Sequence, residues 1–170
     1  GLIAARGFHG LSLAEIAEAV GVTNGGLLHY FGSKAELLIA VLEQRDTLDA
    51  RVVRGDQPAG ADHRTDRRAC RAELLALVRR NASQREIVRL YTVLSAEALD
   101  PGHPAHDFFE RRLERSRRLL GSMAADWHPD PEAFAVQVLS FMDGLQLNWL
   151  RDPGIDLVAE WETFADRLFR

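Results

Sequence analysis

The chain has 170 residues, of which 46% are hydrophobic and 27% charged, and its formal net charge is −4. This length and composition are typical of a soluble globular protein with one or two domains. No apolar run is long enough to cross a membrane, and no signal peptide opens the chain. The single cysteine, Cys70, excludes an internal disulfide and favours a reducing, cytoplasmic location.

We expect the first residues to be the later part of a helix. The chain begins with Gly1 rather than Met, so we expect the native protein to begin upstream. Residues 1–6 are expected to end this helix, and Gly7 to stop it. Phe8 is expected to fill the small core beneath the helices that follow.

Residues 12–34 predict two short helices joined by a tight turn. Ser12 is a candidate N-cap, and Glu15 three residues later completes a capping box. Gly21 suits the left-handed backbone of a C-cap, and Thr23 is a candidate N-cap for a second helix that ends near Tyr30. The predicted buried side holds Leu13, Ile16, Ala17, Val20, Val22, Leu27 and Phe31. This arrangement is typical of a helix-turn-helix.

The same region resembles the DNA-binding region of the TetR family of transcriptional regulators. The residues that match the family pattern are Gly7, Phe8, Ser12, Ile16, Ala17, Gly21, Val22, Thr23, Gly25, Leu27, Tyr30, Phe31, Ser33, Lys34 and Leu37. The chain departs from the pattern at Leu28, where tyrosine is usual, at Gly26, where a small side chain is usual, and at Val20, where alanine is common. The remainder of the chain is similar to family members in helix pattern and length.

The rest of the chain also predicts helices. Ser33 is a candidate cap for a long helix that runs to about residue 52 and connects to a second domain. Residues 55–66 are rich in Gly, Pro and Asp and predict a loop. Further helices are expected at residues 66–80, 84–99, 105–127, 131–150 and after Gly154.

No stretch alternates with the period of a strand, so the predicted fold class is all-α, with about nine helices. We expect an N-terminal helix-turn-helix DNA-binding domain over residues 1–47. A C-terminal helical domain for ligand binding and dimerisation is expected over residues 48–170.

The second short helix is expected to enter a DNA major groove. Asn24 suits an adenine edge or a phosphate, His29 a base acceptor or a phosphate, and Leu28 only a thymine methyl or a sugar. Gly25 lets the backbone approach DNA closely, and the resemblance implies phosphate contacts at Thr23, Tyr30 and Lys34. The full set of DNA-binding candidates is Ser12, Thr23, Asn24, Gly25, Leu28, His29, Tyr30 and Lys34. The alternatives are that Thr23 is only a cap and that Tyr30 belongs to the core.

The charge of this region is unusual for a DNA-binding surface, which commonly carries a basic footprint. This region contains three basic residues and four acidic ones. The basic residues are Arg6, Lys34 and Arg45, and the acidic residues are Glu15, Glu18, Glu36 and Glu43. We therefore expect modest affinity per subunit, with dimerisation supplying much of the tightness.

The last two expected helices are apolar on more than one side, which exceeds what a single core face requires. Two such helices from each of two chains would form a four-helix interface, the dimer arrangement that the resemblance also implies. The candidate interface residues are Val136, Leu139, Leu147, Leu150, Leu157, Trp161 and Phe164.

The resemblance further implies a small-molecule cavity among the central helices. Its candidate lining is Tyr91, Phe108, Phe109, Trp127, Phe141, Met142 and Trp149, although each of these is also explained as ordinary core. Only the spacing of His103 and His106 suggests a metal site. Asp107 is the one further candidate ligand, and these three residues do not make a convincing ligand set. We therefore expect no metal and no cofactor.

The function expected from these features is a homodimeric transcriptional regulator. It is expected to repress by binding a palindromic operator and to be released by a small-molecule effector. The alternative is a DNA-associated protein that recruits a protein partner without a small ligand. An enzyme is not expected, because the sequence shows no nucleophile–base pair, no phosphate-binding loop and no metal set.

Overall fold

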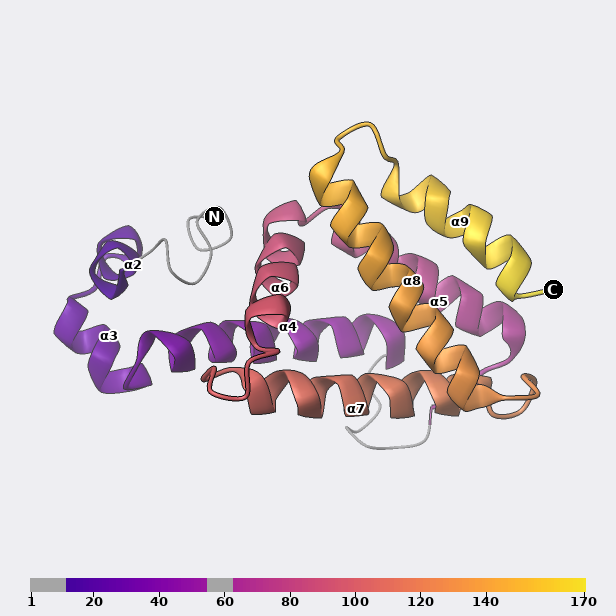
Figure 1. Ribbon diagram of the computed structural model, residues 1–170, viewed down its shortest axis with the longest axis horizontal. Helices are drawn as coiled ribbons and strands as arrows, with labels where there is room; N and C mark the ends of the chain where they lie inside the picture. The colour runs from indigo at the N-terminus through magenta and orange to yellow at the C-terminus, as the bar shows by residue number, and fades with distance from the viewer. Residues whose placement is uncertain (1–11, 55–62) are drawn as a thin grey trace. The chain divides into compact units, whose positions relative to one another are not determined.

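The computed structural model describes residues 12–54 and 63–170 of the chain (Figure 1). The described helices are α2 (Leu13–Val20), α3 (Asn24–Phe31), α4 (Lys34–Arg54), α5 (Arg67–Ala82), α6 (Arg85–Glu97), α7 (His106–Ala124), α8 (Pro131–Arg151) and α9 (Leu157–Leu168). No strand occurs in these residues, and the predicted all-α fold class is confirmed. The predictions for residues 1–6, Gly7, Phe8 and most of the 55–66 loop lie outside the described residues.

Most helix starts are fixed by local side-chain caps, of which the sequence predicts those at Ser12, Thr23 and Ser33. The Ser12 hydroxyl accepts from the Glu15 N–H at 3.2 Å, and Glu15 Oε2 accepts from the Ser12 N–H at 2.8 Å, which confirms the capping box. Ser33 Oγ accepts from the Glu36 N–H at 3.2 Å and caps the start of α4. Asp66, Asp130 and Asp156 cap α5, α8 and α9 in the same way. These bonds satisfy N–H groups that lack partners inside a helix.

The chain forms two compact units that interleave along the sequence. The first unit consists of Gly1–Thr47 and Glu86–Glu110, and the second of Leu48–Arg85 and Arg111–Arg170. The sequence-based division at residue 47 follows chain order alone. The structure also groups α6 and the start of α7 with the N-terminal unit, because a shared apolar core joins them to α4.

The first unit has two apolar clusters. Ile16 and Ala17 of α2 pack with Leu27 of α3 and Leu37 of α4. The other cluster joins the first half of α4 to α6 and the start of α7 through Leu38, Leu42, Leu90, Leu94 and Phe108. The helix that follows α3 is therefore anchored on both clusters, which fixes the position of α3 within this unit.

The second unit is built on α9, which packs against both α5 and α8 (Figure 1). Trp161 of α9 is fully buried, and Phe164 stacks on Phe141 of α8 with ring centroids 3.8 Å apart. Arg71 and Arg79 of α5 form ion pairs with Asp166 and Glu162 of α9. None of the described helices is both long enough and apolar enough to cross a membrane.

Candidate nucleic-acid interface

The α2–turn–α3 segment is held by a glycine turn and a small buried contact. Gly21 has φ 74°, a left-handed conformation that favours glycine, and its N–H is directed to the carbonyls of Ala17 and Glu18. The Val22 N–H donates to the Ala17 carbonyl at 3.0 Å. The predicted glycine C-cap is confirmed, and the turn brings α3 across Ile16 and Ala17.

Two predicted core residues at this turn are not buried. Val20 and Val22 are both exposed, so the prediction that they pack inward is wrong for the described chain. Both lie at the turn, beyond the point where α2 contacts α3 through Ile16 and Ala17. A helical apolar spacing places residues on one face, but it does not determine how far along that face the neighbouring helix reaches.

The outer face of α3 carries most of the predicted DNA-binding residues. Asn24, Gly25, Leu28 and His29 are exposed, whereas Leu27 is buried. Tyr30 is 83% exposed, so the alternative that it belongs to the core is wrong. The His29 and Tyr30 rings meet edge to face with centroids 5.8 Å apart. This face therefore presents an amide, an apolar side chain, an imidazole and a phenol side by side.

Ser12, Thr23 and Lys34 flank this face and have local roles as well. Ser12 and Thr23 are exposed N-caps, and the Thr23 hydroxyl accepts from the Gly26 N–H at 3.0 Å. The Ser12 hydroxyl donates its hydrogen to Glu15 Oε2 at 2.9 Å, whereas the Thr23 hydroxyl accepts at its cap and still has a hydrogen to donate to a phosphate. Lys34 is the first residue of α4 and is half-buried.

The two glycines of α3 differ in the space around them. A methyl group built on Gly25 would meet no atom of the chain within 4 Å. A methyl group on Gly26 would lie 3.1 Å from the Thr23 hydroxyl, which would press on the cap. Packing therefore does not require glycine at position 25, whereas the helix cap restricts position 26.

Positive charge is scarce on this part of the chain. Lys34 and Arg45 are the only lysine or arginine residues between positions 12 and 47, and Arg45 is only 5% exposed. Five carboxylates lie in the same range, at Glu15, Glu18, Glu36, Glu43 and Asp46. The described surface around α3 therefore offers hydrogen-bonding and apolar groups more than positive charge.

The residues of the predicted small-molecule lining belong to both units. Phe108 is buried in the core of the first unit, with Phe109 and Tyr91 packed against it. The Tyr91 hydroxyl lies 2.8 Å from the Leu42 carbonyl and 2.7 Å from Asp46. Met142 and Trp149 are buried in the second unit. The predicted lining is thus divided between the two units, and a pocket shared by these residues stays a prediction.

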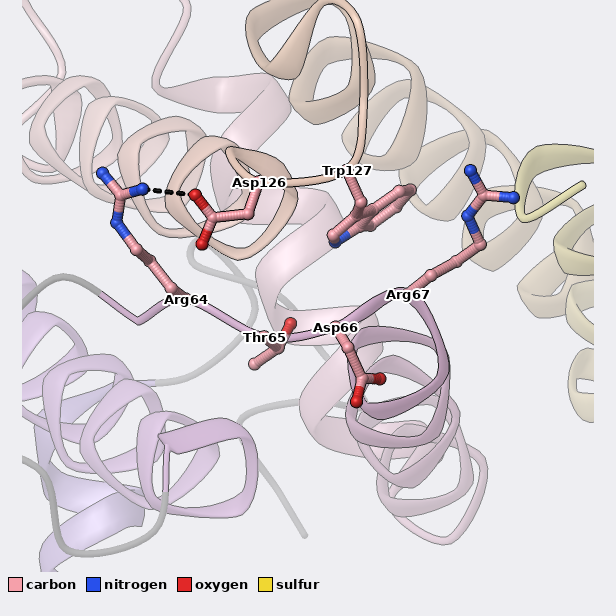
Figure 2. Close-up of a pocket in the computed structure, with 6 residues that line it drawn as sticks. All are labelled: Arg64, Thr65, Asp66, Arg67, Asp126 and Trp127. Atoms are coloured by element: carbon pink, nitrogen blue, oxygen red, sulfur yellow. Dashed lines mark hydrogen bonds and ion pairs between the residues drawn. The ribbon is translucent and has the colours of Figure 1, made fainter.

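The second unit does have an open pocket of about 320 Å³, lined by Arg64, Thr65, Asp66, Arg67, Asp126 and Trp127 (Figure 2). Of the predicted lining, only Trp127 belongs to it. Sequence reasoning missed the other five residues, and no local signal points to them, because Arg64 and Asp126 are 62 positions apart.

The polar groups of this pocket are already used within the chain. Arg64 pairs with Asp126 at 2.5 Å, and the Arg67 guanidinium lies 5.5 Å from the centre of the Trp127 ring (Figure 2). The indole N–H of Trp127 and the Thr65 hydroxyl both donate to the Met123 carbonyl, at 2.9 and 3.2 Å. These interactions indicate that the lining residues form a structural contact between the start of α5 and the α7–α8 connection.

The predicted dimer residues divide into buried and accessible sets. Leu157 and Trp161 are buried within the second unit, so their assignment to a subunit interface is wrong: a single chain already covers them. Val136 is exposed, and Leu139, Leu147, Leu150 and Phe164 are partly buried. These five stay predictions for an interface.

The histidines and the cysteine have structural surroundings. His103 Nδ1 accepts from the Ala105 N–H at 3.1 Å, and His106 Nδ1 lies 2.8 Å from the Ala98 carbonyl, so both stabilise the α6–α7 turn. Cys70 is fully buried, and burial raises the pKa of its thiol to about 12, opposed by a hydrogen bond with Thr65 and reinforced by nearby Glu73. A thiol with this pKa is a core residue rather than a nucleophile.

Comparison with known proteins gives the class of protein. The family model described as bacterial regulatory proteins, tetR family, matches residues 1–41. Over 38 residues the chain is 58% identical to the HTH-type transcriptional regulator RutR of Escherichia coli K12, a match that covers 22% of this chain and 18% of RutR. The chain therefore spans only a small part of RutR in this match.

Two solved structures share the fold over almost the whole chain. A TetR-family transcriptional regulator from Rhodococcus sp. is 20% identical, with a TM-score of 0.76, and the match covers 99% of this chain and 92% of that one. NalD, the secondary repressor of the MexAB-OprM multidrug efflux pump in Pseudomonas aeruginosa, is 24% identical, with a TM-score of 0.69 and coverage of 99% and 89%.

The first 41 residues therefore match the model of the tetR family, and the fold of the chain is similar to that of solved TetR-family regulators. The proteins it resembles are named as regulators of transcription and not as enzymes.

Proposed function

We propose that this protein is a DNA-binding transcriptional regulator that inserts α3 into the major groove of its operator. The observation that carries the proposal is the outer face of α3. Asn24, Leu28, His29 and Tyr30 are all exposed there, on a helix whose other side is anchored by Leu27. A helix-turn-helix places its second helix in the groove in this orientation.

We assign the flanking residues to the phosphate backbone. Thr23, Tyr30 and Lys34 have donors at the two ends of α3, where the helix would leave the groove and meet the phosphates. Ser12 caps α2 and would face the same backbone. Gly25 leaves room for the α3 backbone to approach the base edges, since nothing in the chain occupies the position of its missing side chain.

We further propose that the protein represses transcription as a homodimer bound to a palindromic operator. Two recognition helices would reach half-sites one helical turn, about 34 Å, or a multiple of it apart. The likeness to NalD, which is itself a repressor, supports the sign of regulation. The accessible residues Val136, Leu139, Leu147, Leu150 and Phe164 are the proposed dimer contacts.

Release by a small-molecule effector completes the proposal. An effector would act only by binding the DNA-free conformation more tightly than the DNA-bound one. The alternative, a DNA-bound protein that recruits a protein partner without a small ligand, is favoured by one observation. Phe108, with Tyr91 and Phe109 packed against it, fills the core of the first unit, and Trp149 is buried in the second.

The decisive experiment is selection of bound duplexes from a random DNA library, followed by titration of the selected sequence. We expect Tyr30→Ala to weaken binding roughly tenfold or more, because hydrogen bonds to charged groups are among the strongest. Leu99→Ala is the matched control, since Leu99 is 80% exposed in the same unit and lies outside α3. Failure to enrich any sequence over random DNA would overturn the proposal. Binding that small molecules never release would favour the alternative.

A further inference from the structure

Leu28 is an exposed apolar side chain on α3, on which Asn24, His29 and Tyr30 are also exposed. It is 39% exposed, whereas the preceding residue, Leu27, is buried in the α2–α3 core. Leu28 therefore keeps more than a third of its surface accessible. On a helix that enters a DNA groove, this accessible apolar surface is available for contact with an apolar group of the DNA.

Asn24 lies on the same line of α3, four residues before Leu28. Residues four apart in a helix are neighbours, about 5–6 Å apart. Successive base pairs are about 3.4 Å apart along the DNA axis. Side chains spaced in this way would face base pairs that are neighbours, or separated by one position at most.

The chemistry of the two side chains points to A·T pairs. An asparagine amide matches the N6 and N7 edge of adenine, and an apolar side chain matches the methyl group of thymine. Guanine is most often read by arginine or lysine. The sequence of α3, from Asn24 to Phe31, contains neither.

We propose that Leu28 reads the methyl group of a thymine, next to or one position from an adenine contacted by Asn24, in each operator half-site. This inference rests on the proposed function and adds to it the base pairs that α3 distinguishes. His29 is exposed as well and suits a base acceptor on either kind of base pair, so the assignment concerns only the Asn24–Leu28 line.

The test replaces thymine by uracil, one position at a time, in the duplex selected from the random library. Uracil differs from thymine only in lacking the methyl group, so the change leaves every hydrogen-bonding edge intact. We expect one position per half-site at which uracil weakens binding about fourfold, the effect of losing one buried methyl group. Elsewhere in the half-site the replacement should have little effect.

The Leu28→Ala variant makes the test specific to the side chain. Alanine favours a helix and Leu28 is largely outside the core, so the variant is expected to fold. Its affinity for the thymine duplex should fall to that of the wild-type protein for the uracil duplex, and uracil should then have no further effect. Leu99→Ala should keep the full sensitivity to uracil.

The outcomes separate the inference from the function on which it rests. Specific binding with no uracil-sensitive position, or with equal sensitivity in Leu28→Ala, overturns the thymine reading and leaves a DNA-binding regulator. A selected half-site made only of G·C pairs would do the same. Absence of any preferred sequence overturns both. In the first two cases the apolar surface of Leu28 would be assigned to contact with another protein.

Discussion

The α2–α3 segment and the α5–α8–α9 group are held together in different ways. The first consists of two eight-residue helices, defined by the Ser12 and Thr23 caps and the Gly21 turn, with a small core around Ile16 and Leu27. The second has a fully buried tryptophan, a stacked phenylalanine pair and ion pairs between helices distant in sequence.

The difference follows from what each region does with its surface. The α2–α3 segment leaves a whole helix face exposed and depends on local hydrogen bonds, each worth about 1 kcal/mol, to keep that face in place. The α5–α8–α9 group covers its large side chains with one another. Changes in the second region should therefore affect stability most, and changes in the first should affect DNA binding most.

The largest expected effect is on the reactivity of Cys70, in the core of the second unit. Its pKa of about 12, against an ordinary 9.0, corresponds to a thousandfold lower thiolate fraction at neutral pH. We expect the native protein to resist iodoacetamide at pH 8, and the urea-unfolded protein to react rapidly. Native and unfolded protein reacting at similar rates would contradict a closed core.

The same pKa predicts how stability depends on pH. The unfolded chain loses the Cys70 proton near pH 9, whereas the native chain holds it to about pH 12. The contribution of this group to the free energy of unfolding is therefore complete below pH 9 and is lost as pH rises toward 12. Cys70→Ala should show a shallower loss of stability over that range in urea unfolding.

Trp161→Ala should have the next largest effect. The side chain is 0% exposed and lies 6.2 and 5.7 Å, between ring centroids, from Phe141 and Phe164. Truncation leaves a large cavity and should lower the free energy of unfolding by about 3–5 kcal/mol. Urea unfolding followed by circular dichroism measures the loss.

Trp161→Phe is the matched control for that cavity. It keeps an aromatic ring in the core and removes an indole N–H that has no hydrogen-bond partner in the described part of the chain. Its cost should stay below about 2 kcal/mol. A loss for Trp161→Ala that disappears at high protein concentration would return Trp161 to the dimer interface.

A pair of glycine substitutions separates turn geometry from DNA approach in the first unit. Gly21→Ala should lower stability by about 1–2 kcal/mol, because alanine is strained at φ 74°. Gly25→Ala should raise it by up to about 1 kcal/mol, because alanine favours a helix and the added methyl meets no atom within 4 Å.

Gly25→Ala should have opposite effects on fold stability and on DNA binding. Gly25→Ala is expected to weaken binding to the selected duplex although it stabilises the fold, because its methyl group would stand between the α3 backbone and the base edges. Thermal unfolding and DNA titration of both variants give the two quantities. Unchanged DNA affinity in Gly25→Ala would mean that the α3 backbone does not approach the bases closely.

The sequence predicts most reliably what local hydrogen bonds and backbone geometry determine. The capping box of Ser12, the Gly21 turn, the Ser33 cap and the all-helical fold class all follow from residues within a few positions of one another. The exposed positions on α3 follow from the same period that buries Leu27.

What could not be predicted depends on contacts between distant segments. An apolar line on a helix looks the same whether it faces its own core or a partner, so Leu157 and Trp161 were assigned to the wrong surface. The sequence likewise does not indicate that Phe108 belongs to the first unit and Trp149 to the second. The pairing of Arg64 with Asp126 has no local signature at all.

The smallest expected effect concerns the ion pairs on α5, which differ in exposure. Arg71 and Asp166 are 39% and 63% exposed, whereas Arg80 and Asp49 are 26% and 19% exposed and lie 2.8 Å apart. Water and salt screen an exposed pair, so Arg71→Ala should cost at most about 1 kcal/mol. Arg80→Ala should cost more, because it leaves the more buried Asp49 without that partner.

Double-mutant cycles in low salt and in 1 M NaCl measure the coupling energy of each ion pair. The coupling between Arg71 and Asp166 should largely vanish in high salt, since about 3 Å is the screening length there. The coupling between Arg80 and Asp49 should persist, because less water and fewer ions reach it. Equal couplings in both pairs would mean that the α5–α9 contact excludes solvent as fully as the core around Trp161. The ion pairs would then belong to the packing that stabilises the second unit.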